Sequence, residues 1–79
     1  MNTNNQKILI QIFKVVFDIS EEKELQSIRK LTDDRWDSLR HVSLIAALES
    51  EFGLKLDTSE MELITSYKAA KVFLEEKGL

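Results

Sequence analysis

A chain of 79 residues, 43% of them apolar and 32% charged, is too short for more than one small globular domain, and we expect residues 1–79 to form a single domain. The absence of cysteine excludes disulfide bonds and thiolate metal sites, so helix packing has to stabilise the fold. A net charge of -3 disfavours a nucleic-acid partner, and no apolar run is long enough to span a membrane, so a cytoplasmic location is expected.

The first predicted helix covers about residues 5–18. Its polar residues recur every three or four positions in one narrow stripe: Lys7, Gln11, Lys14 and Asp18. Nearly all of its remaining surface is apolar, so it has to be covered on more than one side, as in a helix bundle. The surplus apolar residues could lie in the core or could support self-association, and the sequence leaves this open: Ile8, Ile10 and Val15.

A polar segment follows, which we expect to be an ordered loop with a short helical turn near residues 22–28. Spaced apolar residues would anchor it to the bundle: Ile19, Leu25, Ile28 and Leu31. A loop this long is uncommon in a small domain unless it has a function. Trp36, near its end, is expected to pack on the bundle rather than to contact a partner, because aromatic rings supply mainly apolar area.

The second helix is predicted over residues 38–52, with Asp37 as its cap and Gly53 in the left-handed position that ends it. Its buried stripe is predicted to be Val42, Ile45, Leu48 and Phe52, with Leu44 at one edge. His41 falls near this stripe and should be partly covered. Leu39 lies off this stripe, on a polar face of the helix that it shares with Ser43, Ala46 and Ser50. An apolar residue on that face suggests a docking surface.

A short third helix is expected near residues 59–64, capped by Asp57 or Thr58. The last helix opens at Ser66 and closes at Gly78, and its inward residues are predicted to be Tyr67, Ala70, Phe73 and Leu74. One common interior is predicted to hold Phe13, Val16, Val42, Ile45, Leu48, Phe52, Ile64 and Phe73. The chain is therefore expected to be all-α, with four helices, a long loop between the first two and a short third helix.

Ser38 is the residue with the most chemical interest. With Asp37 and His41 it supplies the residue types of a hydrolytic triad, but all three lie within one turn of a helix start, and no glycine-rich turn offers an oxyanion site. Alternatively, Ser38 only caps the helix of a small protein-interaction module without a prosthetic group. In a third interpretation, a phosphate esterified to Ser38 would be stabilised by the free N–H groups and the dipole of the helix start.

The charges of the chain favour no DNA-binding role. Its basic cluster consists of Arg29, Lys30, Arg35 and Arg40. Three aspartates interleave with this cluster, so a helix-turn-helix DNA binder ranks last among the possible functions. Four glutamates of the second half either form a solvated face or attract basic partner surfaces, and the sequence leaves this open: Glu49, Glu51, Glu60 and Glu62.

The segment WDSLRHVSLIAALESEFGLKL, residues 36–56, resembles the acyl carrier proteins, small four-helix carriers of acyl or aminoacyl thioesters. The resemblance extends over nearly the whole chain, through the apolar first helix, the long loop, the short third helix and SYKAAKVFLEEKG at the end. It implies a four-helix bundle of the acyl-carrier type. It also implies a non-catalytic, monomeric carrier with no metal site, no membrane partner and no nucleic-acid partner.

The resemblance further implies that Ser38 carries 4′-phosphopantetheine, transferred from coenzyme A by a phosphopantetheinyl transferase with magnesium. The terminal thiol of this arm would hold the cargo, which agrees with a chain that has no cysteine. Asp37 and Leu39 match positions that family members present to the transferase and to partner enzymes. Those partners would be an acyl- or aminoacyl-loading enzyme and downstream transferases.

One departure from the family pattern concerns the surface near Ser38. Carriers of general fatty acid synthesis usually have acidic residues just after the motif, where this chain has Arg40 and Ser43. Leu39 and Ala46 would then form the apolar centre of a mixed-charge patch. The WDSL form resembles freestanding carriers of specialised pathways, so we expect a dedicated loading partner rather than the enzymes of general fatty acid synthesis.

Overall fold

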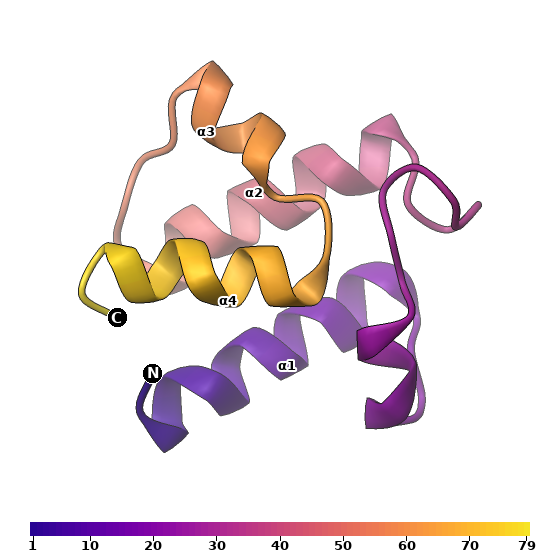
Figure 1. The fold of residues 1–79 in the computed structure, drawn as a ribbon, viewed down its shortest axis with the longest axis horizontal. Coiled ribbons are helices and arrows are strands. Elements are labelled where there is room, and N and C mark those ends of the chain that lie inside the picture. The colour runs from indigo at the N-terminus through magenta and orange to yellow at the C-terminus, as the bar shows by residue number, and fades with distance from the viewer.

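The computed structural model describes all residues 1–79 and contains four α-helices and one short 3-10 helix. In chain order they are α1 (Thr3–Phe17), η1 (Glu22–Gln26), α2 (Ser38–Phe52), α3 (Thr58–Leu63) and α4 (Tyr67–Glu76). In Figure 1 the chain runs one way along α1 and returns along α2 and α4, while α3 lies apart at the top. The all-α fold with four helices, a long first loop and a short third helix is confirmed.

Side-chain caps define where the helices begin. The carboxylates of Asp37 and Asp57 accept hydrogen bonds from the third backbone N–H of α2 and of α3, and Ser66 does the same for α4. The predicted caps are thus confirmed, with Asp57 rather than Thr58 at α3. Helix α1 begins two residues earlier than expected, because the Asn2 side chain accepts from the N–H of Asn5. None of the helices has the length and apolar composition needed to cross a lipid bilayer.

Gly53 ends α2 with a backbone φ of 63°, in the left-handed region that glycine adopts without strain. No atom lies within 4 Å of the place where a β-carbon would stand, so only the backbone would resist a substitution. We therefore expect Gly53→Ala to lower the free energy of unfolding by about 1 kcal/mol in urea denaturation. Ser50→Ala, on an exposed helical position, is the control and should change it by less than about 0.5 kcal/mol. An unchanged midpoint for Gly53→Ala would contradict the left-handed helix end.

The core is largely the predicted one. Five of the eight predicted core residues are buried: Phe13, Ile45, Leu48, Ile64 and Phe73. The four inward residues predicted for α4 are also buried. Two further core predictions hold in part, because the side chains are only partly covered: Val16 and Phe52. Of the surplus residues of α1, Ile8 and Ile10 pack partly on the core, whereas Val15 is exposed.

The prediction that Val42 lies in the core is wrong, because 65% of this residue is exposed. Leu44, expected only at the edge, is fully buried and takes its place. The buried face of α2 is therefore rotated toward Leu44 and Leu48. Leu44 and Leu48 are four positions apart and so lie on one side of the helix, next to Ile45, whereas Val42 lies further round.

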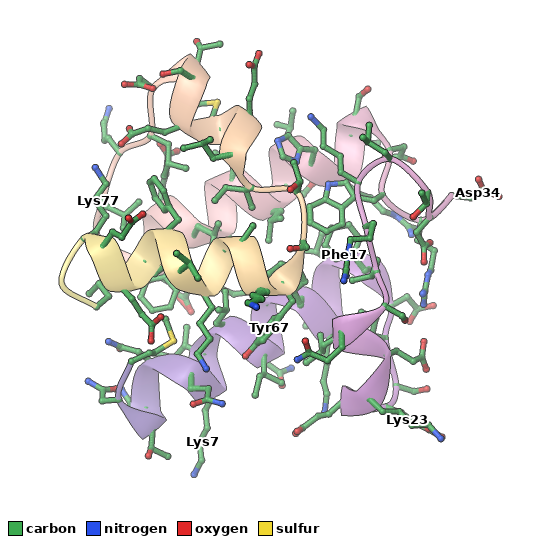
Figure 2. All side chains as sticks on the ribbon, in the orientation of Figure 1. Lys7, Phe17, Lys23, Asp34, Tyr67 and Lys77 are labelled. Carbon is green, nitrogen blue, oxygen red and sulfur yellow. The ribbon has the colours of Figure 1, made fainter.

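The long loop is tied to the bundle near both of its ends and turns outward between them. Its helical turn and three of its four predicted anchors are confirmed: Ile19, Leu25 and Ile28 are buried. The N–H of Lys30 then donates to the carbonyl of Thr65, 3.1 Å away, just before α4. The fourth predicted anchor is wrong, since Leu31 is 90% exposed. Beyond the Lys30 contact the loop leaves the bundle, and Figure 2 shows Asp34 pointing away from the helices at its outer tip.

Candidate functional site

Ser38 is the first residue of α2 and is exposed. The cap of this helix is Asp37, whose Oδ1 accepts from the N–H of Arg40 at 2.8 Å. Ser38 takes no part in the capping contacts, and its hydroxyl has no hydrogen-bond partner in the protein. The hypothesis that Ser38 serves as the cap therefore has no contact to support it. The site presents a free hydroxyl on a rigid helix start.

Trp36 fixes the chain two residues before Ser38. Its side chain is buried with 3% exposed, and its ring packs on two phenylalanines of α1. The ring centroids lie 5.8 Å from Phe13 in an edge-on contact and 4.6 Å from Phe17 in a tilted one. The predicted packing of Trp36 on the bundle is thus confirmed. Because these rings belong to α1, the start of α2 is held directly against the core.

Arg35 ties the same segment to η1. Its guanidinium forms ion pairs with Asp33 at 3.0 Å and with Glu24 of η1 at 3.1 Å. The hydrogen bonds from Arg35 hold the pKa of the Asp33 carboxyl below its usual range, and the two carboxylates raise the pKa of Arg35. The side chain of Arg40 reaches back to the Arg35 carbonyl at 3.3 Å. Arg40 therefore stabilises the helix start and is only partly available to a partner.

His41 lies at the edge of the core, as predicted, between the loop and α3. Its Nδ1 accepts from the indole N–H of Trp36 at 3.1 Å, and its Nε2 lies 3.1 Å from the carbonyl of Met61. Burial and the nearby charge of Lys30 lower its pKa from the usual value, and the Met61 contact opposes this in part. Both ring nitrogens are engaged away from Ser38. No hydrogen bond joins Ser38 to His41, and the arrangement does not form a hydrolytic triad.

An apolar surface borders Ser38. Leu39 is 76% exposed, and Ser43 and Ala46 are exposed with it, which agrees with the predicted face. The sequence analysis missed one member, Val42 of α2, because Val42 was assigned to the core. A groove of about 190 Å³ lies beside this surface, lined by His41, Val42, Ile45, Ala46, Glu49 and Met61.

The four glutamates of the second half do not behave as one group. Glu49 accepts from the N–H of Leu56 at 2.9 Å, and Glu60 pairs with Lys77 at 2.7 Å. The Lys77 ammonium holds the pKa of Glu60 below its usual range. Glu51 and Glu62 are exposed. Two of the four carboxylates are thus engaged in structural contacts, and of the two exposed ones Glu51 lies more than three turns along α2 from Ser38.

Comparison with known proteins places these features in a family. Three curated relatives come from strains Tuc7, APS and 5A of Buchnera aphidicola subsp. Acyrthosiphon pisum, and each is named acyl carrier protein. Each is 35% identical over 72 residues, which cover 87% of this chain and 90% of the relative. The chain belongs to the acyl carrier protein family. No family model matches it, and no solved structure matches it.

Membership in the acyl carrier protein family assigns the chain an acyl carrier role without catalysis of its own. The helical bundle and the position of Ser38 agree with it. The N–H groups of Ser38 and Leu39, at the first turn of α2, have no acceptor in the protein, as is usual at a helix start. A phosphate on the Ser38 oxygen would lie near these donors, so the residues present fit a phosphate-linked prosthetic group.

Proposed function

We propose that this acyl carrier protein carries acyl or aminoacyl groups as thioesters on 4′-phosphopantetheine attached to Ser38. The observation that supports the proposal is the exposed, unpartnered Ser38 hydroxyl at the start of a capped helix. When attached, the arm supplies the thiol that a chain without cysteine lacks. The hydroxyl is the attachment point, and the first N–H groups of α2 stabilise the phosphate charge.

Asp37 and Trp36 support Ser38 in different ways. Asp37 caps α2 through its side chain, so the helix start persists without help from the serine. Trp36 holds the preceding chain against α1. Ser38 therefore stays exposed in a fixed place, where a phosphopantetheinyl transferase can reach it. Leu39 beside it, with Ser43 and Ala46 one and two turns on, forms the surface that we assign to the transferase, the loading enzyme and downstream transferases.

Intact mass spectrometry tests the attachment. The purified chain is incubated with coenzyme A, magnesium and a phosphopantetheinyl transferase of broad specificity. We expect the mass to rise by one phosphopantetheine, and peptide mapping should place it on Ser38. A chain that gains no mass while a known carrier in the same tube is fully modified would instead be a protein-interaction module.

The partner enzymes are proposed to be dedicated ones, because the first turns of α2 after Ser38 carry no carboxylate that would attract a basic enzyme surface. Arg35 and Arg40 lie near Ser38, and Ser43 is neutral. Exposed Glu51 lies more than three turns along α2. Electrostatic complementarity acts mainly on the encounter rate and on partner choice. The arrangement therefore favours a specialised pathway over general fatty acid synthesis.

Two added carboxylates should shift this partner choice. In Arg40→Glu combined with Ser43→Glu, we expect loading by general fatty acid synthesis enzymes to rise roughly tenfold at low salt, and loading by the dedicated enzyme to fall. The change should shrink as salt is raised, because exposed charges are screened. Loading rates of holo-protein measured at two salt concentrations check this.

Ser50→Glu is the matched control, since it adds one charge to the exposed surface of α2 three turns from Ser38. It should leave both loading rates nearly unchanged. Equal loading of the unmodified sequence by both enzyme sets would contradict a dedicated partner. Ser43→Glu alone separates charge from structure, because it leaves the contact between Arg40 and the Arg35 carbonyl in place.

A further inference from the structure

The one tryptophan and the one histidine of the chain join across Ser38. Trp36 precedes the serine by two residues, His41 follows it by three, and the indole N–H donates to the imidazole Nδ1 at 3.1 Å. Their ring centroids are 6.2 Å apart. We call this contact the Trp36–His41 clasp. Because it closes the segment on both sides of Ser38, the conformation of the modified residue depends on it.

The clasp also joins three elements of the fold. The indole ring packs on Phe13 and Phe17 of α1. His41 belongs to α2, and its Nε2 faces the carbonyl of Met61 in α3 at 3.1 Å. This hydrogen bond adds to the partial packing of Met61 on the core and so links α3 to α2. A change in the imidazole would therefore reach Ser38 and α3 together.

The hydrogen bonds select one protonation state of the imidazole. An indole N–H can only donate, so Nδ1 has to offer its lone pair, and the proton of the neutral ring has to stand on Nε2. There it donates to the Met61 carbonyl, which can only accept. A second proton on Nδ1 would face the indole N–H, donor against donor. The clasp therefore exists only with a neutral ring.

We propose that neutral His41 is a positioning residue for the modification of Ser38, and that protonation of Nδ1 opens the clasp and releases the start of α2. The proposal rests on the proposed attachment of phosphopantetheine to Ser38. His41 takes no part in the transfer itself. It holds the segment that carries the serine in the conformation that the transferase engages, so an open clasp lowers the rate of modification without unfolding the domain.

The charges around the ring agree with a neutral state at pH 7. Burial disfavours a positive imidazole, and the charge of Lys30 in the loop acts in the same direction, so the pKa of His41 lies below its usual value although the Met61 contact opposes the shift. On α2, the side chain of Arg40 donates to the Arg35 carbonyl. Glu49, which lines the same groove as His41, accepts from the N–H of Leu56. On α3, Glu60 pairs with Lys77 and Glu62 is exposed. No carboxylate forms an ion pair with the ring.

The sign of the pH effect follows from this lowered pKa. The folded chain binds fewer protons than the unfolded chain below about pH 6.5, so acid weakens the folded state over this range. The clasp is closed above the folded-state pKa of His41 and opens as the pH falls through it. Carboxylates contribute their own losses only at lower pH, since their ordinary pKa values lie near 4.

Nuclear magnetic resonance on the unmodified sequence tests the clasp without a variant. The ring nitrogen shifts of the single histidine should show the Nε2–H tautomer at about pH 7.5, and its titration midpoint should lie below about 6.5. The indole N–H resonance of the single tryptophan should move with the same midpoint. A neutral ring with its proton on Nδ1 would contradict the clasp. An indole N–H resonance that does not shift as His41 titrates would also contradict it.

Trp36→Phe is the matched variant, because it keeps an aromatic ring against α1 and removes the indole donor. Circular dichroism first establishes that it is folded. Its His41 midpoint should move upward, toward about 6.5, because a proton on Nδ1 no longer meets another donor. A midpoint equal to that of the original sequence would show that the indole N–H does not control the ring, against the proposal.

Transfer kinetics test the positioning role. The kcat/KM for phosphopantetheine transfer to the original sequence is divided by that for His41→Gln at each pH, so that the pH dependence of the transferase cancels. We expect this ratio to fall several-fold between about pH 7.5 and a pH below the titration midpoint of His41 found by nuclear magnetic resonance, because the variant lacks the titrating ring. A flat ratio overturns the positioning role and leaves modification of Ser38 intact. No modification of the original sequence at any pH overturns both the attachment and the positioning role.

Discussion

Ser38→Ala should abolish the gain of one phosphopantetheine and leave the helical fold intact. The exposed hydroxyl makes no hydrogen bond, and Asp37 still caps α2, so we expect the free energy of unfolding to change by less than about 1 kcal/mol. Intact mass after incubation with coenzyme A and transferase measures the first effect. Circular dichroism and urea denaturation measure the second.

Ser50→Ala is the matched control for this experiment. Ser50 is also an exposed serine of α2, but it lies about three turns from Ser38, outside the surface assigned to the transferase. This variant should be modified as fully as the unchanged chain. Attachment of the arm to Ser43, Ser50 or any other hydroxyl would contradict the assignment, as would modification of Ser38→Ala itself.

Phe13→Ala should have the largest effect on stability, with a loss of roughly 3–5 kcal/mol. Phe13 is fully buried, and its ring contacts Phe17, Trp36 and Tyr67 at centroid distances of 5.4 to 5.8 Å. Its removal leaves a cavity where α1, α4 and the loop meet. This loss is a large fraction of the free energy of unfolding of a small domain, so we expect much of the variant to be unfolded at 37 °C. Urea denaturation at 25 °C measures the loss.

Val42→Ala is the control for the core deletion and also checks the register of α2. At 65% exposure Val42 contributes little buried area, so we expect a change below about 0.5 kcal/mol. Phe52→Ala should lower the free energy of unfolding by about 1–2 kcal/mol, because Phe52 is only partly buried. This loss lies between those expected for Val42→Ala and Phe13→Ala. A loss of several kcal/mol at Val42, with little at Phe13, would contradict the observed core.

Features encoded by neighbouring residues could be predicted from the sequence, and those that depend on distant contacts could not. Asp37, Gly53 and Ser66 end or begin helices through contacts with adjacent turns, so their roles follow from local chemistry. Val42 and Leu44 are both apolar and both near the inward face of α2. Which of them is buried depends on how the other elements pack on α2, and the sequence of α2 alone does not encode that.

In the candidate site, too, the features set by neighbouring residues could be predicted and those set by tertiary contacts could not. Ser38 is marked by its motif and by its place at a helix start, and both are visible in the sequence. The contact of Trp36 with His41 joins a loop residue to a helix five positions on, which helical periodicity does not predict. The signal that could have indicated it is the presence of one tryptophan and one histidine on either side of the motif.

Helix α3 is held in a different way from the rest of the bundle. None of its six side chains is fully buried, although Met61 packs partly on the apolar core that α1, α2 and α4 share. Polar contacts add to this: the capping box of Asp57 and Glu60, the ion pair of Glu60 with Lys77, and the Met61 carbonyl at His41. Local opening of an element with so little buried apolar surface costs less free energy than global unfolding. We therefore expect two levels of cooperativity in this domain, with α3 opening more often than the core that the three longer helices form.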